Sequence, residues 1–271
     1  MVKKVAFIGA GSMAEAIIAG MINKNVLESE QIFVANKENE ARLEELKSKY
    51  NIKGNTNKEE VIQEADVIFF ATKPYDMEHA ILDTKKYIQA HQLVISVVAG
   101  VSTGFITDKL EKEVAVIRAM PNTSATIGYS ATAITKGKFA TDTHIALAKK
   151  LFEAIGAVSV VEEEKMHIVT GISGSGPAYV YYLVEALEKA ALEEGLDEKT
   201  AKQLITQTII GAGNMLKYAQ EPVSVLRENV TSPNGTTAAG LRTLGEYNFQ
   251  DAVVNCVKSA TNRSRELGEE Q

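Results

Sequence analysis

The segment Gly9-Ala10-Gly11-Ser12-Met13-Ala14 has the glycine spacing of a phosphate-binding turn. It follows an apolar, strand-like run at Val5–Ile8 and opens a helical pattern. In such a turn Gly9 permits the tight bend, Gly11 lets the backbone approach a pyrophosphate, and the helix start supplies amides for the phosphates. A glycine turn without a ligand is the alternative. The flanking strand and helix favour a dinucleotide site, with Gly9, Gly11, Ser12 and Met13 among its residues.

The end of the next expected strand bears on which dinucleotide binds. NAD sites usually place Asp or Glu there to hold the ribose 2′-hydroxyl, whereas this strand ends in Asn36-Lys37. Asn36 has no charge to repel a 2′-phosphate, and Lys37 could pair with one. The alternative is that Lys37 is a solvated surface lysine. The pattern predicts NADPH as the cofactor, with NADH also possible.

Two proline-containing segments follow later strands, Ala71-Thr72-Lys73-Pro74 and Ala119-Met120-Pro121-Asn122-Thr123. Ligands of open α/β sheets lie outside the carboxyl ends of the strands, so both segments fall at the expected edge. Proline also simply ends a strand and starts a helix. We expect both roles for Pro74, and a position beside the nicotinamide for Pro121 and Asn122.

A second glycine-rich stretch, Gly171–Ala178, precedes a long helical pattern that starts near Pro177. As a loop before a helix it would present small residues and free amides, which can receive a carboxylate. Alternatively, the small residues let a helix pass close to the sheet. The local pattern leaves both interpretations open.

The segment Val230–Leu241 places four hydroxyls beside Pro233-Asn234-Gly235, just before another helical pattern. Ser and Thr at a helix start are often only caps, but a cap needs one hydroxyl. The turn-forming centre leaves several amides pointing outward. We therefore expect an anion site for a small carboxylate here.

The four histidines, His79, His91, His144 and His167, occur singly and at no metal-ligand spacing. Neither Gly171–Ala178 nor Val230–Leu241 contains a Lys or His. Reduction of a ketone normally needs a placed general acid, whereas an imine nitrogen can arrive already protonated. The composition of these segments therefore fits C=N reduction better than C=O reduction, although a hydroxyl could relay a proton.

Strand-like and helical patterns alternate through the first part of the chain. The near-continuous apolar strands predict a parallel sheet covered on both faces, a doubly wound Rossmann-type α/β domain. The expected helices are 14–24, 38–49 and 76–90. The expected strands are 5–8, 32–35, 67–71, 93–97, 114–118, 131–135 and 158–161.

After about residue 162 the patterns are helical only, at 177–194, 199–218, 235–244 and 250–267. We therefore expect a cofactor domain over residues 1–162 and an all-helical substrate-binding and dimerisation domain over residues 163–271. Residues 1–150 have a net charge of +1 and residues 151–271 a net charge of −7. The long apolar helices of the second domain predict burial against another copy, hence at least a homodimer.

Composition excludes several classes of protein. Cys256 is the single cysteine, so no internal disulfide or cysteine-built zinc site is expected. No apolar run approaches the roughly 20 residues that span a bilayer, so we expect no membrane partner and a cytoplasmic location. A net charge of −6 and a pI of about 5.4 argue against nucleic-acid binding.

The chain resembles the pyrroline-5-carboxylate reductases over essentially its whole length. The resemblance is carried by the segments Phe7–Ala14, Ala71–Pro74, Met120–Thr123, Gly171–Tyr179 and Thr231–Thr237. The first is shared by many dehydrogenases, whereas the last two together are specific to this family. The resemblance implies a Rossmann-type domain, a helical domain that interlocks with a second subunit, and larger assemblies of such dimers. It also implies NAD(P)H-dependent reduction of 1-pyrroline-5-carboxylate to L-proline, the last step of proline biosynthesis.

The resemblance implies site residues at the positions of this chain that match the family's motifs. Ser232, Gly235 and Thr236 would hold the substrate carboxylate, and Thr237 would place its hydroxyl at the ring nitrogen as the catalytic residue. The expected substrate-binding set is Ser175, Ser232, Gly235, Thr236 and Thr237. The expected cofactor-binding set is Gly9, Gly11, Ser12, Met13, Asn36, Lys37, Asn57, Ala71, Lys73, Pro74, Ala99, Pro121 and Asn122. No metal ligand is expected.

Two features depart from the family pattern. Asn234-Gly235 replaces the more usual Gly-Gly, and since Asn tolerates positive φ we expect the turn to survive. The spacing from Pro222 to Leu226 is one residue longer than common, so Gln220 and Glu221 receive no role.

Two other functions are alternatives to reduction of a cyclic imine. A hydroxy-acid dehydrogenase of similar plan needs a catalytic Lys or His on the first helix of the second domain, where Pro177–Lys189 offers only Lys189. A reductase-like regulator without chemistry would have eroded one of the binding loops, and both are intact.

Overall fold

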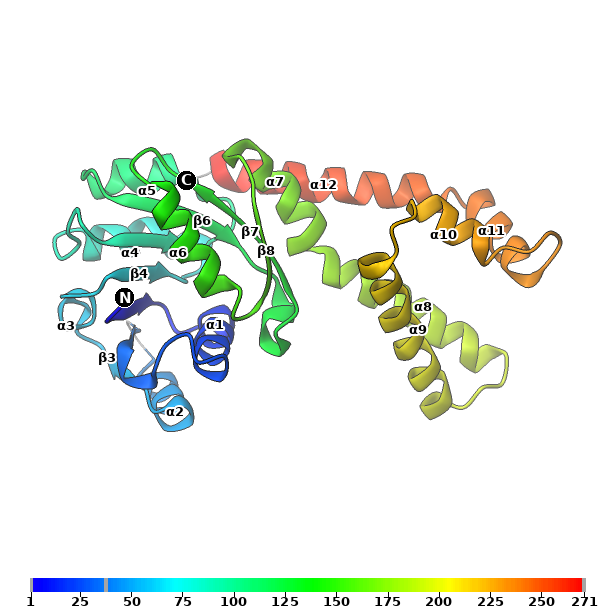
Figure 1. The fold of residues 1–271 in the computed structure, drawn as a ribbon, viewed down its shortest axis with the longest axis horizontal. Coiled ribbons are helices and arrows are strands. Elements are labelled where there is room, and N and C mark those ends of the chain that lie inside the picture. The colour runs from blue at the N-terminus through cyan, green and yellow to red at the C-terminus, as the bar shows by residue number, and fades with distance from the viewer. Residues whose placement is uncertain (1, 37–38, 270–271) are drawn as a thin grey trace. The chain divides into compact units, whose positions relative to one another are not determined.

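The computed structural model describes residues 2–36 and 39–269. The chain forms two compact units (Figure 1). The sheet unit comprises Met1–Pro177 and Lys258–Gln271, and the helical unit comprises Ala178–Val257. Among the described residues, no helix is long and apolar enough to cross a membrane.

One eight-stranded sheet, of order β3-β2-β1-β4-β5-β6-β7-β8, organises the sheet unit. All seven strands expected from the sequence are present, with their ends shifted by at most two residues. The short strand β3 joins them at one edge. The strands are β1 (Val5–Ile8), β2 (Ile32–Ala35), β3 (Lys53–Asn55), β4 (Val67–Phe70), β5 (Leu93–Ser96), β6 (Ala115–Met120), β7 (Ser130–Lys136) and β8 (Gly156–Val160).

The sheet is parallel from β3 through β6, whereas β7 pairs antiparallel with β6. The connection between these two strands explains the change in direction. It consists of Pro121, Asn122, a single 3-10 turn at Thr123–Ile127 and two further residues. A parallel return needs a crossover of a dozen residues or more, so this short connection permits only an antiparallel partner.

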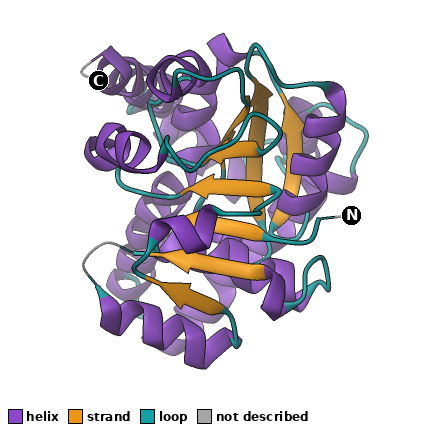
Figure 2. Ribbon diagram, turned by 90° about the vertical axis from the view of Figure 1, so that its left-hand side faces the viewer, coloured by secondary structure: helices purple, strands orange, loops and turns teal. Residues whose placement is uncertain are grey.

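Helices cover both faces of the sheet (Figure 2). The side chains of β1 alternate between the two faces and so belong to two core clusters. Val5 and Phe7 belong to the core cluster that α1 (Ser12–Asn23), α2 (Glu40–Tyr50) and α6 (Asp142–Phe152) complete. Ala6 and Ile8 belong to the cluster that α3 (Lys58–Ile62), α4 (Met77–Thr84) and α5 (Thr103–Leu110) complete. Because both faces are buried, strands such as β1 and β4 are apolar at every position.

The helices of the sheet unit follow the strands. They are α1 (Ser12–Asn23), α2 (Glu40–Tyr50), α3 (Lys58–Ile62), α4 (Met77–Thr84), α5 (Thr103–Leu110), α6 (Asp142–Phe152) and α7 (Met166–Val169). The prediction that α4 runs to residue 90 is wrong. The Thr84 hydroxyl donates to the carbonyl of Ala80, and Lys112 Nζ binds the carbonyls of Lys85 and Ile88 at 2.5 and 2.6 Å. These bonds support a turn in place of further helix.

The remaining helices are α8 (Gly176–Glu193), α9 (Glu198–Tyr218), α10 (Val223–Asn229), α11 (Thr236–Glu246) and α12 (Phe249–Glu269). Every residue of the helical unit is described, and Ala201 alone is buried there. Large apolar side chains are exposed on several of its helices, among them Tyr182, Leu183, Leu204, Met215 and Val254. A single copy of this unit therefore buries little apolar surface of its own.

Glu15 of α1 is held by three side chains of α2. Lys49 Nζ lies 2.9 Å and Tyr50 Oη 2.8 Å from its Oε1, and Arg42 pairs with Oε2. The bond from Lys49 contributes most, and together these bonds outweigh the opposing effect of burial. They lower the pKa of Glu15 to about 2.

Replacing Glu15 by Gln is expected to reduce stability at neutral pH and to flatten the acid limb of the stability profile. The folded-state pKa is below the usual 4.5, so the carboxylate's contribution is fully present above that pH. It is lost as the pH falls towards about 2. Urea unfolding of wild type and Glu15→Gln at a series of pH values measures the effect. The exposed Glu30 provides the control Glu30→Gln, and parallel profiles for wild type and Glu15→Gln would contradict the prediction.

Candidate functional site

The turn after β1 brings three strand ends together. Gly9 N donates to the carbonyl of Ala35 and Ala71 N donates to that of Ile8, both at 2.9 Å. Gly9 has φ +109°, and a Cβ built on it would stand 2.5 Å from the Ala71 carbonyl oxygen. Only glycine therefore fits between the ends of β1 and β4.

Gly11 plays a different part, as the N-cap of α1. Its φ is −73°, a Cβ built on it would meet no atom within 4 Å, and no side chain caps the helix. The space beside the first amides of α1 is thus open. An uncapped helix start with room for close approach suits a phosphate, which is the fit that a dinucleotide requires.

A cavity of about 300 Å³ lies at this edge of the sheet. The structure brings five of the predicted cofactor-binding residues into its lining, Gly9, Gly11, Asn36, Ala71 and Lys73. Ser12 and Met13 form the first turn of α1, and Pro74 begins the 3-10 turn after Lys73. Lys37 is outside the described residues.

The cavity also has lining residues that the sequence analysis missed, namely Lys58, Asp76 and His79. Lys58 Nζ is 2.8 Å from Asp83 Oδ2, and His79 Nε2 is 3.2 Å from the same oxygen. The neighbouring Asn57 was predicted. It caps α3, accepting from Glu59 N at 3.0 Å and donating to Glu60 Oε1 at 2.9 Å. The sequence signal that could have found Lys58 is its position immediately after Asn57.

Asn122, predicted to lie beside the nicotinamide, is 8% exposed, and its backbone N–H and both side-chain polar atoms form hydrogen bonds. Its backbone N–H donates to Ser130 Oγ, its Oδ1 accepts from Ser124 N, and its Nδ2 donates to the carbonyl of Ser173 at 2.9 Å. Pro177 explains that last bond. It has no N–H to offer the carbonyl four residues earlier, so the Ser173 oxygen is available to Asn122.

The prediction of a loop at Gly171–Ala178 is wrong. Helix α7 continues through a π-helical turn at Thr170–Gly174 directly into α8, and Ser175 N donates to the carbonyl of Thr170 at 2.9 Å. A Cβ on Gly174 would stand 2.7 Å from Met120 Cε. The small residues therefore let this helical stretch pass close to the end of β6, the second of the two interpretations.

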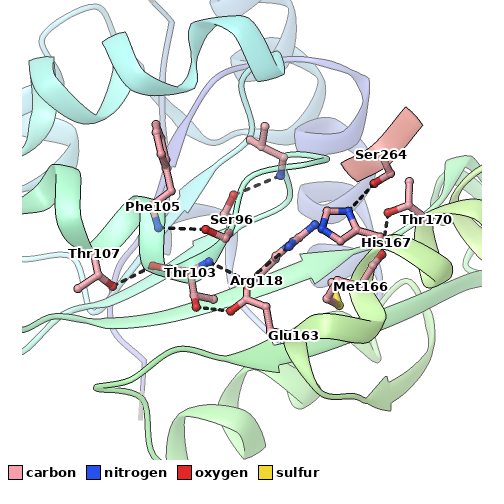
Figure 3. Close-up of polar contacts among 12 residues, drawn as sticks. Ser96, Thr103, Phe105, Thr107, Arg118, Glu163, Met166, His167, Thr170 and Ser264 are labelled. Atoms are coloured by element: carbon pink, nitrogen blue, oxygen red, sulfur yellow. Dashed lines mark hydrogen bonds and ion pairs between the residues drawn. The ribbon is translucent and has the colours of Figure 1, made fainter. Parts of the chain in front are cut away.

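Ala99 and Pro121, both in the predicted cofactor-binding set, follow β5 and β6. A buried charge lies near the ends of these two strands (Figure 3). Arg118 on β6 is 2% exposed and pairs with Glu163 at 3.4 Å. Glu163 also accepts the backbone N–H of Thr103 at 2.8 Å and its hydroxyl. Glu163 thus joins the end of β6 to the start of α5.

Close to this pair, His167 and the end of α12 meet. His167 Nδ1 is 3.0 Å from Ser264 Oγ, and a Cβ on Gly268 would stand 2.8 Å from the Gly100 carbonyl oxygen. Burial, reinforced by the nearby charges of Arg118 and Arg265, lowers the pKa of His167. Within the described residues, no group of three or more His, Cys, Asp or Glu is placed to hold a metal.

Glu163→Gln is expected to lower the free energy of unfolding by about 3 kcal/mol, because it leaves a buried guanidinium without a counter-charge. Chemical denaturation measures the loss. The adjacent, exposed Glu164 provides the matched control, and Glu164→Gln is expected to remain within about 0.5 kcal/mol of wild type. Equal stability of the two variants would show that Arg118 does not depend on Glu163.

The hydroxyl-rich segment lies in the helical unit, at the start of α11. Asn234 has φ +59°, which confirms that Asn maintains the turn where the family usually has glycine. Gly235 is the N-cap, and no side chain caps α11. The Thr231 hydroxyl donates a hydrogen bond to the carbonyl of Arg227 at 2.6 Å. The structure thus places Ser232, Gly235, Thr236 and Thr237 together, with the last two forming the first turn of α11.

Comparisons with known proteins agree with both halves of this description. Residues 4–100 match the family model described as NADP oxidoreductase coenzyme F420-dependent. Residues 163–267 match the family model described as pyrroline-5-carboxylate reductase dimerisation.

Full-length relatives carry the same family name. Pyrroline-5-carboxylate reductase 1 of Bacillus subtilis is 46% identical over 268 residues, covering 99% of this chain and 90% of that protein. A pyrroline-5-carboxylate reductase structure from Coxiella burnetii gives a TM-score of 0.91 at 32% identity, covering 98% of this chain and 99% of that one. A Plasmodium falciparum pyrroline carboxylate reductase structure with NADP bound gives 0.89 at 30% identity, covering 98% of each chain. The chain belongs to the pyrroline-5-carboxylate reductase family.

Proposed function

We propose that the protein reduces 1-pyrroline-5-carboxylate to L-proline with NADPH, with NADH as an alternative cosubstrate, in the last step of proline biosynthesis. The observation that carries the proposal is the start of α11. There a helix N-terminus without a side-chain cap carries the hydroxyls of Thr236 and Thr237 beside Ser232. Uncapped amides bind an anion such as the substrate carboxylate, and hydroxyls suit an already protonated ring nitrogen.

The sheet unit would hold the cofactor. Gly9 and Gly11 give the phosphates access to the amides of α1, and Asn36 lines the same cavity. When bound, a reduced nicotinamide supplies a hydride to the C=N carbon. The other proposed contacts are Ser12, Met13, Lys37, Asn57, Ala71, Lys73, Pro74, Ala99, Pro121 and Asn122.

The helical unit would orient the substrate. Ser232, Gly235 and Thr236 bind the carboxylate, which fixes the face of the ring that is reduced. Ser175, a residue of the sheet unit, is a further proposed substrate contact. Thr237 places its hydroxyl at the ring nitrogen and holds the N–H proton in position. The protein's main contribution is therefore orientation of the reacting atoms.

We assign the cofactor role to residues 1–162 and the substrate and dimerisation roles to residues 163–271. The exposed apolar side chains of the helical unit support assembly into a homodimer, from which larger assemblies can be built. We also propose a cytoplasmic location.

The direct test is the loss of NADPH absorbance on addition of pyrroline-5-carboxylate, with L-proline identified as the product. A folded sample that oxidises no NADPH or NADH with this substrate would overturn the proposal. A hydroxy-acid dehydrogenase would instead need Lys189 in catalysis. That residue is well exposed on α8 and lies 3.8 Å from Glu193, so the structure offers it no protected site.

A further inference from the structure

We propose that Lys58 recognises the 2′-phosphate of NADPH and thereby decides between NADPH and NADH. The inference deepens the proposed function, since it concerns the cofactor used by the same site. It starts from the cavity at the ends of β1, β2 and β4, whose lining includes Lys58 and Asn36.

The order of the strands separates Lys58 from the other lysine of the cavity. Asn55, the last residue of β3, pairs with Ala35, the last residue of β2. Lys58 therefore follows β3 on the side of Asn36, where the ribose that carries the 2′-substituent is held in dinucleotide-binding folds. Lys73 follows β4, whose last residue pairs with Ile8 of β1, and so lies toward the phosphate turn.

The Lys58 ammonium is also held in one place. Its side chain is 16% exposed, and among the described residues Asp83 is its one partner, at 2.8 Å. An ammonium has three N–H donors, so this bond leaves two for a ligand. By contrast Lys73 is exposed, with its ammonium 5.6 Å from the centre of the Tyr75 ring.

Charge decides the preference. Asn36, which follows β2, lacks the carboxylate that would repel a 2′-phosphate, and Lys58 adds a cation on that side of the cavity. Asp83 holds the cation and is itself contacted by His79 at 3.2 Å. Removing Lys58 would therefore take away the phosphate's partner and leave the Asp83 carboxylate close by, and both changes disfavour NADPH.

The test compares two probes that differ only in the 2′-phosphate, 2′,5′-ADP and 5′-AMP, by titration calorimetry. Lys58→Met is expected to weaken binding of 2′,5′-ADP about 10- to 100-fold, as for loss of a charged hydrogen bond, and to leave 5′-AMP within about twofold. Lys58→Arg is expected to keep most of the preference. The double variant Lys58→Met/Asp83→Asn should recover part of the affinity for 2′,5′-ADP, because the Asp83 carboxylate near the 2′-phosphate is gone.

A matched control is Lys86→Met, which removes an exposed lysine whose ammonium lies 4.7 Å from the centre of the Tyr87 ring. It is expected to bind both probes like wild type. With the intact enzyme, the ratio of kcat/KM for NADPH to that for NADH should fall by the same factor in Lys58→Met.

The inference is overturned if wild type does not distinguish the probes, if Lys58→Met keeps the wild-type preference, or if it loses both probes equally. Failure of the proposed function has a different signature. In that case neither cofactor reduces pyrroline-5-carboxylate, while the two probes still report on the role of Lys58.

Discussion

Replacing Thr237 by alanine is expected to lower kcat about 100-fold, in the range seen for loss of a group that handles a proton, while the dissociation constant for NADPH stays unchanged. Thr237 is the second residue of α11, in the helical unit, whereas the phosphate turn belongs to the sheet unit. The variant removes one hydroxyl and leaves the backbone amides at the start of α11 in place. Steady-state kinetics and NADPH titration measure the two quantities separately.

Two companion variants sharpen this prediction. Thr237→Ser keeps the hydroxyl and should retain most of the activity. Thr243 lies on the same helix with its hydroxyl 3.4 Å from the carbonyl of Ala239, and Thr243→Ala should behave like wild type. Loss of NADPH binding in Thr237→Ala would contradict the role assigned to this hydroxyl.

Gly9→Ala is expected to abolish measurable NADPH binding and to lower the free energy of unfolding by about 2–4 kcal/mol. The new methyl group would stand 2.5 Å from the Ala71 carbonyl oxygen, in a backbone conformation with φ +109°. The ends of β1 and β4 must then separate, and the turn that faces the phosphates loses its shape.

The neighbouring Gly11→Ala separates damage to the fold from damage to the binding site. Its methyl group would meet no protein atom within 4 Å, so its unfolding free energy should stay within about 0.5 kcal/mol of wild type. NADPH affinity should nevertheless fall, because the methyl group occupies space that the pyrophosphate needs. Gly104→Ala, on exposed α5 surface, is the control for a harmless methyl group. Normal NADPH binding by Gly11→Ala would place the phosphates elsewhere.

The seven expected strands of the sheet unit could be predicted from the sequence because most of their positions are apolar and turns bound them, whereas β3, with the sequence Lys-Gly-Asn, has no apolar run. The phosphate turn could also be predicted, because the G-x-G spacing of Gly9 and Gly11 lies between a strand pattern and a helix pattern. In that position the spacing is typical of a turn that binds a pyrophosphate. The turn at Asn234 was predictable because positive φ is a local property of a residue type.

What could not be predicted depends on contacts distant in sequence. The end of α4 is determined partly by Lys112, and the helical form of residues 170–174 places Gly174 against Met120. Lys58 gains its position from Asp83, 25 residues away. None of these partners produces a periodic signal around the residue it affects, so a reading of local patterns misses them.

The chain enters the helical unit after Pro177 and returns to the sheet unit at Lys258, so the segment between is a loop closed at both ends. His167 and Ser264, 97 residues apart, meet where it closes. The entropy of closing a loop grows only with the logarithm of its length, about 0.6 kcal/mol for each doubling. Insertions at an exposed turn such as residues 194–197 therefore add little to the free-energy cost of docking the end of α12. The helical unit can vary in length during evolution while the sheet unit keeps its closing contact.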